Sequence, residues 1–390
     1  MMCKKYDIII IGGGPVGMAV SLALQELGLS ILLLESRGLP EKEEDPRPLA
    51  LSYGSRLILE RFGVWRNLIQ TTPITTIHIS NRYGFGRTII TTDSAGVPAL
   101  GYVVNYHSLF LSMHGLLQHN KTDYLTGVKV SNIETSHDAG QVAFEYGNET
   151  TKVTAKLVVL ADGGRLSEKI KNIHYRVHDY QQWAIVANIK ATNQQHGIAY
   201  ERFTQDGPIA LLPSGDNFAL VWTVNPSMAK EVLAMNDSEF LNQLQKDFGH
   251  RVGKFMDASK RTGFPLALKY ATPVTAQRIA LVGNAAQTLH PVAGQGFNLG
   301  LRDARDLASE IMLSTNLGTK IGTSAMLSRY RQKRQIDSGA GKVFTDSLIK
   351  IFSHDNSILR NICGIGLSTL DSLPPLKRFV ARRMIFGTRG

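Results

Sequence analysis

Three short runs dominated by apolar residues stand out along the chain, at 7–11, 157–160 and 279–282. Such runs, rich in Ile, Leu and Val, are typical of parallel strands that are buried on both faces. Each run leads into a turn containing Gly, Asp or Asn. Because ligands of parallel sheets bind at the carboxyl ends of the strands, we expect these three distant segments to converge on one ligand.

Helical periodicity follows the first run over 15–27, with proline near its start and Gly28 after its end. The apolar run 31–34 comes next and ends at Glu35, which completes a strand–helix–strand unit. Short strands with Gly- and Pro-containing turns over 183–224 indicate a mostly antiparallel sheet. Further helices are expected at 52–62, 109–117, 238–248, 295–311 and from 325 onward.

The glycine turn between the first strand and helix carries the spacing of a dinucleotide site. Gly12 allows a tight turn, Gly14 lets the backbone approach a pyrophosphate, and Gly17 lets helix and strand pack closely. The phosphates would lie at the positive end of the helix dipole. Glu35 is placed to accept hydrogen bonds from ribose hydroxyls. The alternative is a glycine-rich turn without a ligand.

Composition limits the remaining possibilities. A chain of 390 residues suggests about two structural units. Its two cysteines, Cys3 and Cys363, fit a reducing compartment, and no Cys/His spacing suggests a metal site. The net charge of +11 leaves nucleic acid, an anionic membrane or acidic proteins as candidate partners. No nucleic-acid motif occurs, so we expect a protein that does not bind nucleic acid. The reducing compartment that the cysteines indicate is expected to be the cytoplasm.

Two segments resemble the flavin motifs of the group A flavoprotein monooxygenases. The first is Leu-Val-Val-Leu-Ala-Asp-Gly at 157–163, and the second is the long segment 280–300, which contains Asn-Ala-Ala and Gly-Gln-Gly. The resemblance implies FAD as cofactor. The residues that it places at the flavin, besides those of the glycine turn, are Asp162, Asn284, Gly294, Gln295 and Gly296. Many relatives have Asp in place of Asn284, and their usual serine is here Leu166.

Other segments are similar to the ubiquinone-biosynthesis hydroxylases within that group, over nearly the whole chain. They lie at 47–52, 62–65, 101–104 and 201–205, and are most similar to enzymes acting on 2-octaprenyl-6-methoxyphenol. The resemblance implies an α/β fold with a discontinuous, Rossmann-like FAD-binding domain, an inserted, mostly antiparallel substrate sheet and a helical C-terminal region. We expect the FAD-binding domain at 1–75, 101–180 and 271–324, substrate-domain strands at 76–100, the substrate sheet at 181–270, and the helical region at 325–390.

The chemistry implied by the resemblance is ring hydroxylation with O2, with NADPH or NADH as transient reductant. Pro291 is similar to the proline whose carbonyl lies near the reacting oxygen. His290 and His107 are candidates for tuning the phenol proton, with a structural role as the alternative for each. Arg47 would contact the flavin or its pyrophosphate, or else form a loop salt bridge. The expected substrate is a polyprenyl-methoxyphenol, hydroxylated para to its hydroxyl.

The basic and apolar segment 376–386 leaves two interpretations open. It could lie on an anionic inner membrane that holds a polyprenyl substrate. It could equally be a last helix packed on the body with a solvated basic face. Other enzymes of ubiquinone biosynthesis are candidate partners. The rival functions are a sibling hydroxylase of another ring position, a flavin-dependent prenyl reductase, and a non-catalytic flavin-fold binding protein.

Overall fold

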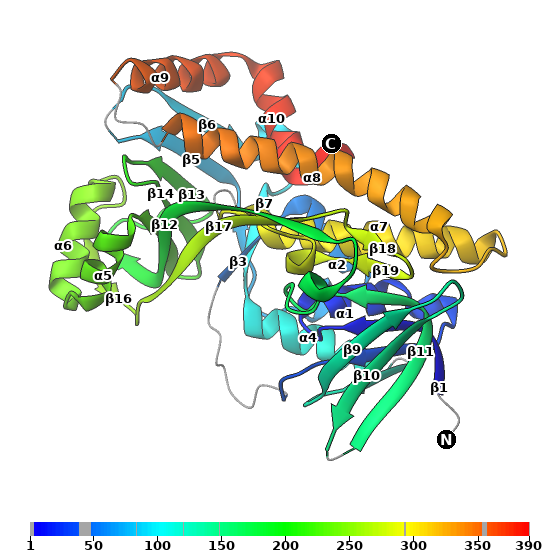
Figure 1. Cartoon of the computed structure of the whole chain (residues 1–390). Helices are drawn as coiled ribbons and strands as arrows, with labels where there is room; N and C mark the ends of the chain where they lie inside the picture. The colour runs from blue at the N-terminus through cyan, green and yellow to red at the C-terminus, as the bar shows by residue number, and fades with distance from the viewer. Residues whose placement is uncertain are drawn as a thin grey trace.

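The chain forms two lobes joined by helices that run across both (Figure 1). The structure is a computed structural model that describes residues 4–38, 48–82, 84–119, 121–147, 149–291, 294–352 and 357–389; of 340–352, 357–363 and 389 it describes the backbone alone. The β9–β11 lobe holds the parallel strands, and the lobe with α5 and α6 holds most of the second sheet.

The parallel strands of the first lobe align as the apolar runs predict. In the described part of the chain, this sheet has eight strands, with β18-β19-β11-β1-β2-β8 as its main order and β10 and β9 extending from β11. Ile11 pairs with Leu160 on one side and Leu34 on the other, and Leu160 pairs with Leu281. The carboxyl ends of three distant segments therefore meet at one edge, which confirms the expected convergence. The strands are β1 (Lys4–Ile11), β2 (Ile31–Leu34), β8 (Thr122–Leu125), β9 (Lys129–Thr135), β10 (Gly140–Tyr146), β11 (Glu149–Leu160), β18 (Thr275–Ala276) and β19 (Ile279–Leu281).

Helices cover this sheet. They are α1 (Pro15–Ala23), α4 (Tyr106–Gln118), α7 (Gln295–Asn316) and α8 (Ser324–Phe352). The helix predicted at 15–27 ends four residues early, and a 3-10 turn, η1 (Gln25–Leu27), leads into Gly28 at φ 63°. α1 packs against both α4 and α7. A Cβ at Gly300 would lie 2.8 Å from the Val16 side chain, so a residue without a side chain permits the close approach of α7 to α1.

The second sheet is mostly antiparallel, with one parallel pair, β13 and β5. Its main order is β20-β17-β12-β15-β14-β13-β5-β6, and β16 pairs with β12. The helices α5 (Pro226–Ala234) and α6 (Asp237–Phe248) pack on one face around Trp222 and Phe240. The opposite face is turned toward a cavity. The strands are β5 (Thr76–Asn81), β6 (Arg87–Thr91), β12 (His174–Ala191), β13 (Ile198–Phe203), β14 (Pro208–Ser214), β15 (Asn217–Val224), β16 (Phe255–Ala258), β17 (Thr262–Thr272) and β20 (Gln287–Thr288).

A small third sheet joins the lobes and was not expected. It pairs β3 (Pro48–Ser52) with β7 (Gly101–Asn105), and β7 with β4 (Thr72–Ile74). β7 lies in the range 101–180, which was predicted to belong to the FAD-binding domain. It pairs in this third sheet and not in the parallel sheet of the first lobe. β12 starts at His174, ahead of the predicted boundary at 181.

The C-terminal helices cover the second sheet. α9 (Ser357–Ser372) packs on β6, and α10 (Pro374–Phe386) packs on α3 and α2. In Figure 1 α9 lies above β6, and α10 descends beside β5 and β6. Among the described residues, no helix combines the length and apolar character that a bilayer crossing requires. The remaining elements are α2 (Tyr53–Arg61), α3 (Thr92–Ala95), η2 (Trp65–Asn67), η3 (Ser167–Lys169), η4 (Gly283–Ala285) and η6 (Gly387–Arg389).

Candidate active site

The turn between β1 and α1 is too tight for side chains at two of its glycines. A Cβ at Gly12, whose φ is 110°, would lie 2.4 Å from the carbonyl oxygen of Ala161. A Cβ at Gly17 would lie 1.9 Å from the carbonyl oxygen of Gly12. By contrast, a Cβ at Gly14 would meet nothing within 4 Å, and Gly14 lines a cavity. The turn is thus closed toward the protein and open where a pyrophosphate would approach the N-terminus of α1.

Glu35 sits at the end of β2 with its carboxylate held by the same turn. The Gly13 N–H donates to Oε2 at 2.7 Å, and the Arg37 N–H donates to Oε1 at 3.0 Å. Burial alone would raise the pKa of Glu35, but these two N–H groups and the Arg37 guanidinium hold it below the ordinary value. Glu35 is therefore ionised at pH 7 and lines the cavity, as acceptance of ribose hydroxyls requires.

Helix α7 begins where the second flavin motif predicts, directly after Gly294. Gly294 is its N-cap at φ 60°, and Gln295 and Gly296 line the cavity. Asn298 fixes this helix end: its Oδ1 accepts from the Ser52 N–H at 2.8 Å, and its Nδ2 donates to the carbonyl oxygens of Ala50 and Gly294. The free N–H groups of the first turn carry partial positive charge. This helix end can therefore stabilise negative charge on a group bound against it.

The remaining predicted flavin contacts also line the cavity. Asp162 accepts hydrogen bonds from the N–H groups of Gly164 and Leu166, so its carboxylate shapes its own loop. Asn284 is exposed within η4. The Pro291 carbonyl accepts the Gly294 N–H at 2.8 Å. These roles at the flavin stay predictions, and Arg47 lies outside the described residues.

The two histidines lie off the cavity wall. His290 is fully buried, with its ring edge-on to Tyr180 at 5.3 Å between centroids. Burial lowers the pKa of His290 to about 4, so it is uncharged at pH 7. His107 is half-buried in the first turn of α4. Neither ring belongs to the described residues that line the cavity. Within the described residues, no cluster of His, Cys, Asp or Glu could hold a metal ion.

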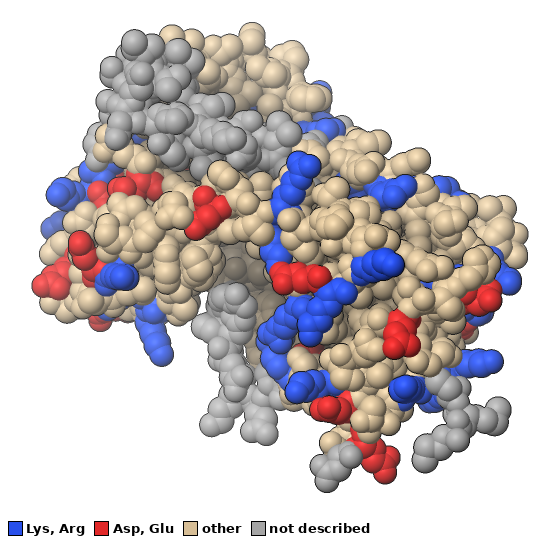
Figure 2. Space-filling view, in the orientation of Figure 1, with Lys and Arg blue, Asp and Glu red and all other residues tan. Residues whose placement is uncertain are grey.

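One cavity of about 1020 Å³ connects these groups to the second sheet. Its cofactor end contains Arg37, Lys129 and Arg165 beside the glycine turn. Figure 2 shows a hollow in the surface between the two lobes, with Lys and Arg side chains along the side formed by the lobe that holds the parallel strands. Its other end is apolar and is lined by β5, β14 and the helices α9 and α10. This end of the cavity is poor in Asp and Glu, and Glu201 on β13 is the carboxylate among the described residues that line it from the second sheet.

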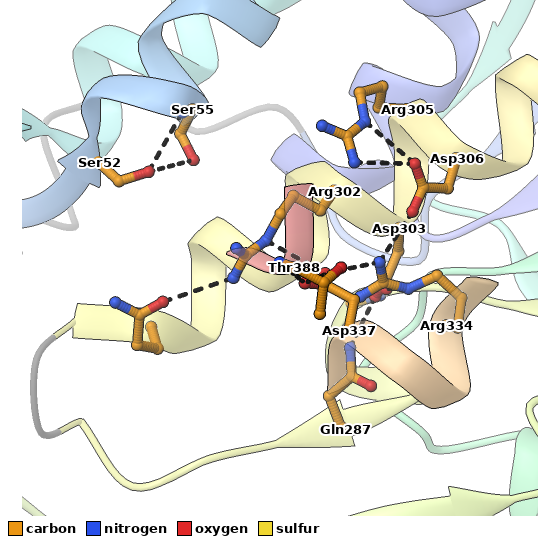
Figure 3. A network of polar contacts seen from close by, with 12 residues as sticks. Ser52, Ser55, Gln287, Arg302, Asp303, Arg305, Asp306, Arg334, Asp337 and Thr388 are labelled. Carbon is orange, nitrogen blue, oxygen red and sulfur yellow. Dashed lines mark hydrogen bonds and ion pairs between the residues drawn. The ribbon is translucent and has the colours of Figure 1, made fainter. Parts of the chain in front are cut away.

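A buried ion network supports the cofactor end from behind (Figure 3). Arg334 of α8 pairs with Asp303 at 2.5 Å, Asp306 at 2.9 Å and Asp337 at 2.8 Å. Burial raises the pKa of Asp303 to about 6, against the opposing effect of Arg334. Asp303 also accepts the N–H of Gly283 at 2.8 Å, and Gly283 lines the cavity. The network thus fixes the η4 loop relative to α7 and α8.

The sequence reasoning missed the supporting residues of this site. Asn298 lies within the second flavin motif, and Asp303 follows it closely. Both fall in the helix predicted from Gln295, at three and eight residues after it, so their position near the helix start could have marked them as supporting residues. Ser167, one residue past the expected serine, is buried and contacts the Tyr175 hydroxyl, which donates to the Ala285 carbonyl. No periodicity marks such contacts.

Comparison with known proteins matches this arrangement to a family. The sequence profile described as "FAD binding domain" matches residues 5–337. The ubiquinone hydroxylase UbiL of Rhodospirillum rubrum is 30% identical over 388 residues, which cover 97% of this chain and 89% of that protein. The chain belongs to this FAD-binding family of ubiquinone hydroxylases. It is an FAD-dependent aromatic-ring monooxygenase, and NAD(P)H is the reductant typical of the family.

Other relatives agree with this assignment. The 3-demethoxyubiquinol 3-hydroxylase of Escherichia coli K12 is 28% identical over 97% of this chain and 98% of that protein. Among solved structures, p-nitrophenol 4-monooxygenase PnpA of Pseudomonas putida DLL-E4 superposes with a TM-score of 0.81. It covers 99% of this chain and 100% of its own, at 15% identity, and so supports the fold.

Proposed function

We propose that this ubiquinone hydroxylase relative hydroxylates a 2-polyprenyl-6-methoxyphenol para to its hydroxyl in ubiquinone biosynthesis. The observation that carries the proposal is the shape of the cavity. Its cofactor end holds the glycine turn, Glu35 and the start of α7, and its far end is apolar. A prenyl tail gains about 0.8 kcal/mol for each buried CH2. A phenol carrying a long apolar chain is the substrate class that fits both ends.

The residues of this chain supply position, charge and dryness. FAD, when bound, supplies electron transfer from NAD(P)H and activation of O2. The glycine turn of Gly12, Gly14 and Gly17 would let the backbone approach the pyrophosphate, and Glu35 would accept hydrogen bonds from the ribose. The N-terminus of α7 stabilises negative charge at its end by about 1–2 kcal/mol. The positive side chains at the cofactor end, Arg37, Lys129 and Arg165, attract the phosphates of a nicotinamide nucleotide.

The hydroxyl oxygen of a phenol donates electron density to the ortho and para carbons of the ring. In a 2-polyprenyl-6-methoxyphenol both ortho carbons already carry substituents, so the para carbon is the activated position that remains open. A second candidate is hydroxylation at another ring position of the same pathway. It is favoured by the similarity to the E. coli protein named a 3-hydroxylase.

Purified protein tests the proposal. The yellow holoenzyme, supplied with NADPH or NADH, O2 and a short-chain 2-prenyl-6-methoxyphenol, should yield a product heavier by one oxygen atom. Nuclear magnetic resonance of that product assigns the ring position. In parallel, the gene should restore quinone synthesis in a strain lacking the corresponding ring hydroxylase and not in strains lacking the others. A colourless protein that flavin does not reconstitute, or reductant oxidation without ring product, would contradict the proposal.

The surface of α10 supports peripheral contact with the membrane that holds such a substrate. Its outward residues Leu376 and Phe379 are exposed by 42% and 63%, and Arg378 and Arg382 lie beside them in sequence. The inward residues Val380 and Met384 line the cavity. We therefore propose that α10 lies at the membrane surface and that the apolar end of the cavity opens near it.

Co-sedimentation with liposomes containing anionic lipid tests this contact. The double variant Leu376→Ser/Phe379→Ser should lose binding while keeping its flavin. The matched control is Leu317→Ser, which alters a residue 65% exposed in the segment after α7. Equal binding by both variants and the wild type would remove α10 from the membrane contact.

A further inference from the structure

The carboxyl group of Glu201 lies on the cavity face of the second sheet, where no described residue hydrogen-bonds its buried Oε1 atom. Successive β-strand residues point to opposite faces. Ala199, Tyr200, Glu201 and Phe203 of β13 all border the cavity. The Tyr200 ring nevertheless packs toward Phe248 of α6 on the other face of the sheet, with ring centroids 6.1 Å apart. The strand register therefore directs Glu201 into the cavity.

The pairing of neighbouring strands shows how isolated this carboxyl group is. Glu201 pairs with Ala210 on β14 and with Ile79 on β5. Ala210 pairs in turn with Val221 on β15, which pairs with Val186 on β12. Glu201 thus interrupts a row of otherwise apolar cavity-lining side chains across five strands.

The helices opposite this row add no charge. None of the described residues that line the cavity from β5, β14, α9 or α10 is ionisable; they include Ile79, Leu212, Leu370, Val380 and Met384. The Oε1 atom of Glu201 is buried and has no hydrogen-bond partner in the part of the chain that the structure describes. Burial alone raises the pKa of Glu201 to about 7, and no charged neighbour contributes to the shift.

A buried polar atom without a partner destabilises the fold, and more so when it is charged. A sheet face that needed only to hold a prenyl chain would be better served by Val or Leu at this position. Because native proteins rarely leave such groups unsatisfied, an unpaired carboxyl in a ligand cavity indicates that the ligand supplies the partner. The group that a phenol offers is its O–H.

Resting on the proposed function, we infer that Glu201 accepts the proton of the substrate's phenol hydroxyl and so orients the ring. The phenol O–H bond breaks, its electron pair stays on the oxygen and spreads into the ring, and the proton bonds to Oε1. The ring carbon takes up one oxygen atom of O2, and the other oxygen atom is reduced to water with the electrons of NAD(P)H. That carbon then loses its hydrogen as a proton to water, and the C–H electron pair returns to the ring and restores its aromaticity. Glu201 gives its proton back to the ring oxygen, which yields the neutral product.

The placement also bears on which carbon reacts. Pro291, Gly294 and Gly296 line the cofactor end of the cavity, whereas Glu201 belongs to the sheet face. A phenol whose hydroxyl meets Glu201 presents its para carbon at the opposite end of the ring. Glu201 would therefore select the para carbon by anchoring the hydroxyl away from the cofactor end.

The test compares Glu201→Gln and Glu201→Asp with the wild-type holoenzyme. A general base contributes about 10²–10⁴-fold to rate. Glu201→Gln should lower hydroxylation about 100-fold or more while NADPH oxidation continues, so product per NADPH falls. The rise of kcat/KM with pH near 7 should vanish in Glu201→Gln and persist in Glu201→Asp. A phenol made more acidic by fluorine substitution should suffer a smaller loss. Glu145→Gln, an exposed change on β10, is the control and should match the wild type.

A second measurement does not depend on turnover. Above pH 7, where Glu201 is ionised, infrared difference spectra should show its carboxylate band shifting when a phenol binds to the wild type, because the phenol O–H then donates to Oε1. Glu201→Gln should show no such shift. Hydroxylation with unchanged coupling and pH profile in Glu201→Gln would overturn this inference and leave the proposed function standing. Phenol binding without the carboxyl change would overturn it too. A wild type that neither binds nor hydroxylates any phenol would overturn both.

Discussion

Removal of Arg334 should destabilise the protein and its flavin site together. The Arg334 side chain is 2% exposed and neutralises Asp303, Asp306 and Asp337 at once. In Arg334→Met, Asp306 keeps Arg305 and Asp337 keeps Arg302, but Asp303 loses its cation. Breaking a buried ion pair from one side costs about 3–5 kcal/mol.

Protonation of Asp303 limits how much the free energy of unfolding falls in Arg334→Met. A carboxyl group with an ordinary pKa near 3.9 can be protonated at pH 7 at a cost of about 4 kcal/mol. The variant would therefore bury a neutral Asp303 rather than an unpaired charge, and the destabilisation should stay within the stated range. As the pH falls from 7 toward 6, protonation of Asp303 in the variant becomes cheaper, so the stability difference from the wild type should shrink by up to about 1.4 kcal/mol per pH unit. Below pH 6 the wild-type Asp303, whose pKa burial raises to about 6, becomes protonated as well, and the difference should level off.

Urea denaturation of the FAD-loaded protein, followed by circular dichroism and by flavin fluorescence, measures both effects. Because Asp303 holds the N–H of Gly283 at the cavity, flavin release should occur at lower urea in the variant. The control is Arg331→Met on the same helix, because the Arg331 guanidinium lies 3.5 Å from Ser328 Oγ, at the limit of a hydrogen bond. That variant should stay within about 0.5 kcal/mol of the wild type. Equal midpoints and slopes for Arg334→Met and the wild type would refute the reasoning.

Three further predictions concern the cofactor turn and the buried histidine. Gly17→Ala forces a Cβ to 1.9 Å from the Gly12 carbonyl oxygen, so the purified protein should lose most of its flavin absorbance, whereas Gly115→Ala, inside α4 with open space around it, should keep it. Glu35→Gln removes the charge that accepts two backbone N–H groups, and FAD titration should show affinity about 10- to 100-fold weaker; an unchanged Kd would contradict the role of the charge. His290 has a folded pKa of about 4, below its unfolded value near 6.5, so the unfolded state binds more protons and stability falls as pH drops from 6.5 to 4. The contribution is about 3 kcal/mol, and His290→Phe should flatten the denaturation-midpoint profile over that window; a profile as steep as that of the wild type would exclude His290 as its source.

Local signals in the sequence were enough to predict the cofactor half of the fold. The apolar runs ending at Ile11 and Leu160 predict buried parallel strands, because no polar position interrupts them. The glycines of the first turn mark where a backbone must pass close to another, as at Gly12 and Ala161. Helix α7 begins where the second flavin motif predicts, directly after Gly294.

The substrate half depends on pairings that no local pattern encodes. β3 and β7 pair across about fifty residues, and only that long-range contact reveals their sheet. Glu201 lies in a segment noted for family resemblance, but its chemical meaning depends on burial. That burial arises from the register of β13 between β14 and β5 and from the cover of α9 and α10.

The cavity keeps the positions that would bind the cofactor apart from the positions that would shape the substrate space, so substitutions can change one without the other. The residues predicted to hold the cofactor lie in loops at the edge of the parallel sheet, whereas the far wall of the cavity is made of side chains on a different sheet. A substitution at a wall position such as Ala210 or Val221 alters the space offered to a ring and leaves the redox machinery untouched. Descendants of such a chain can therefore acquire new ring substrates one residue at a time while continuing to use the same flavin.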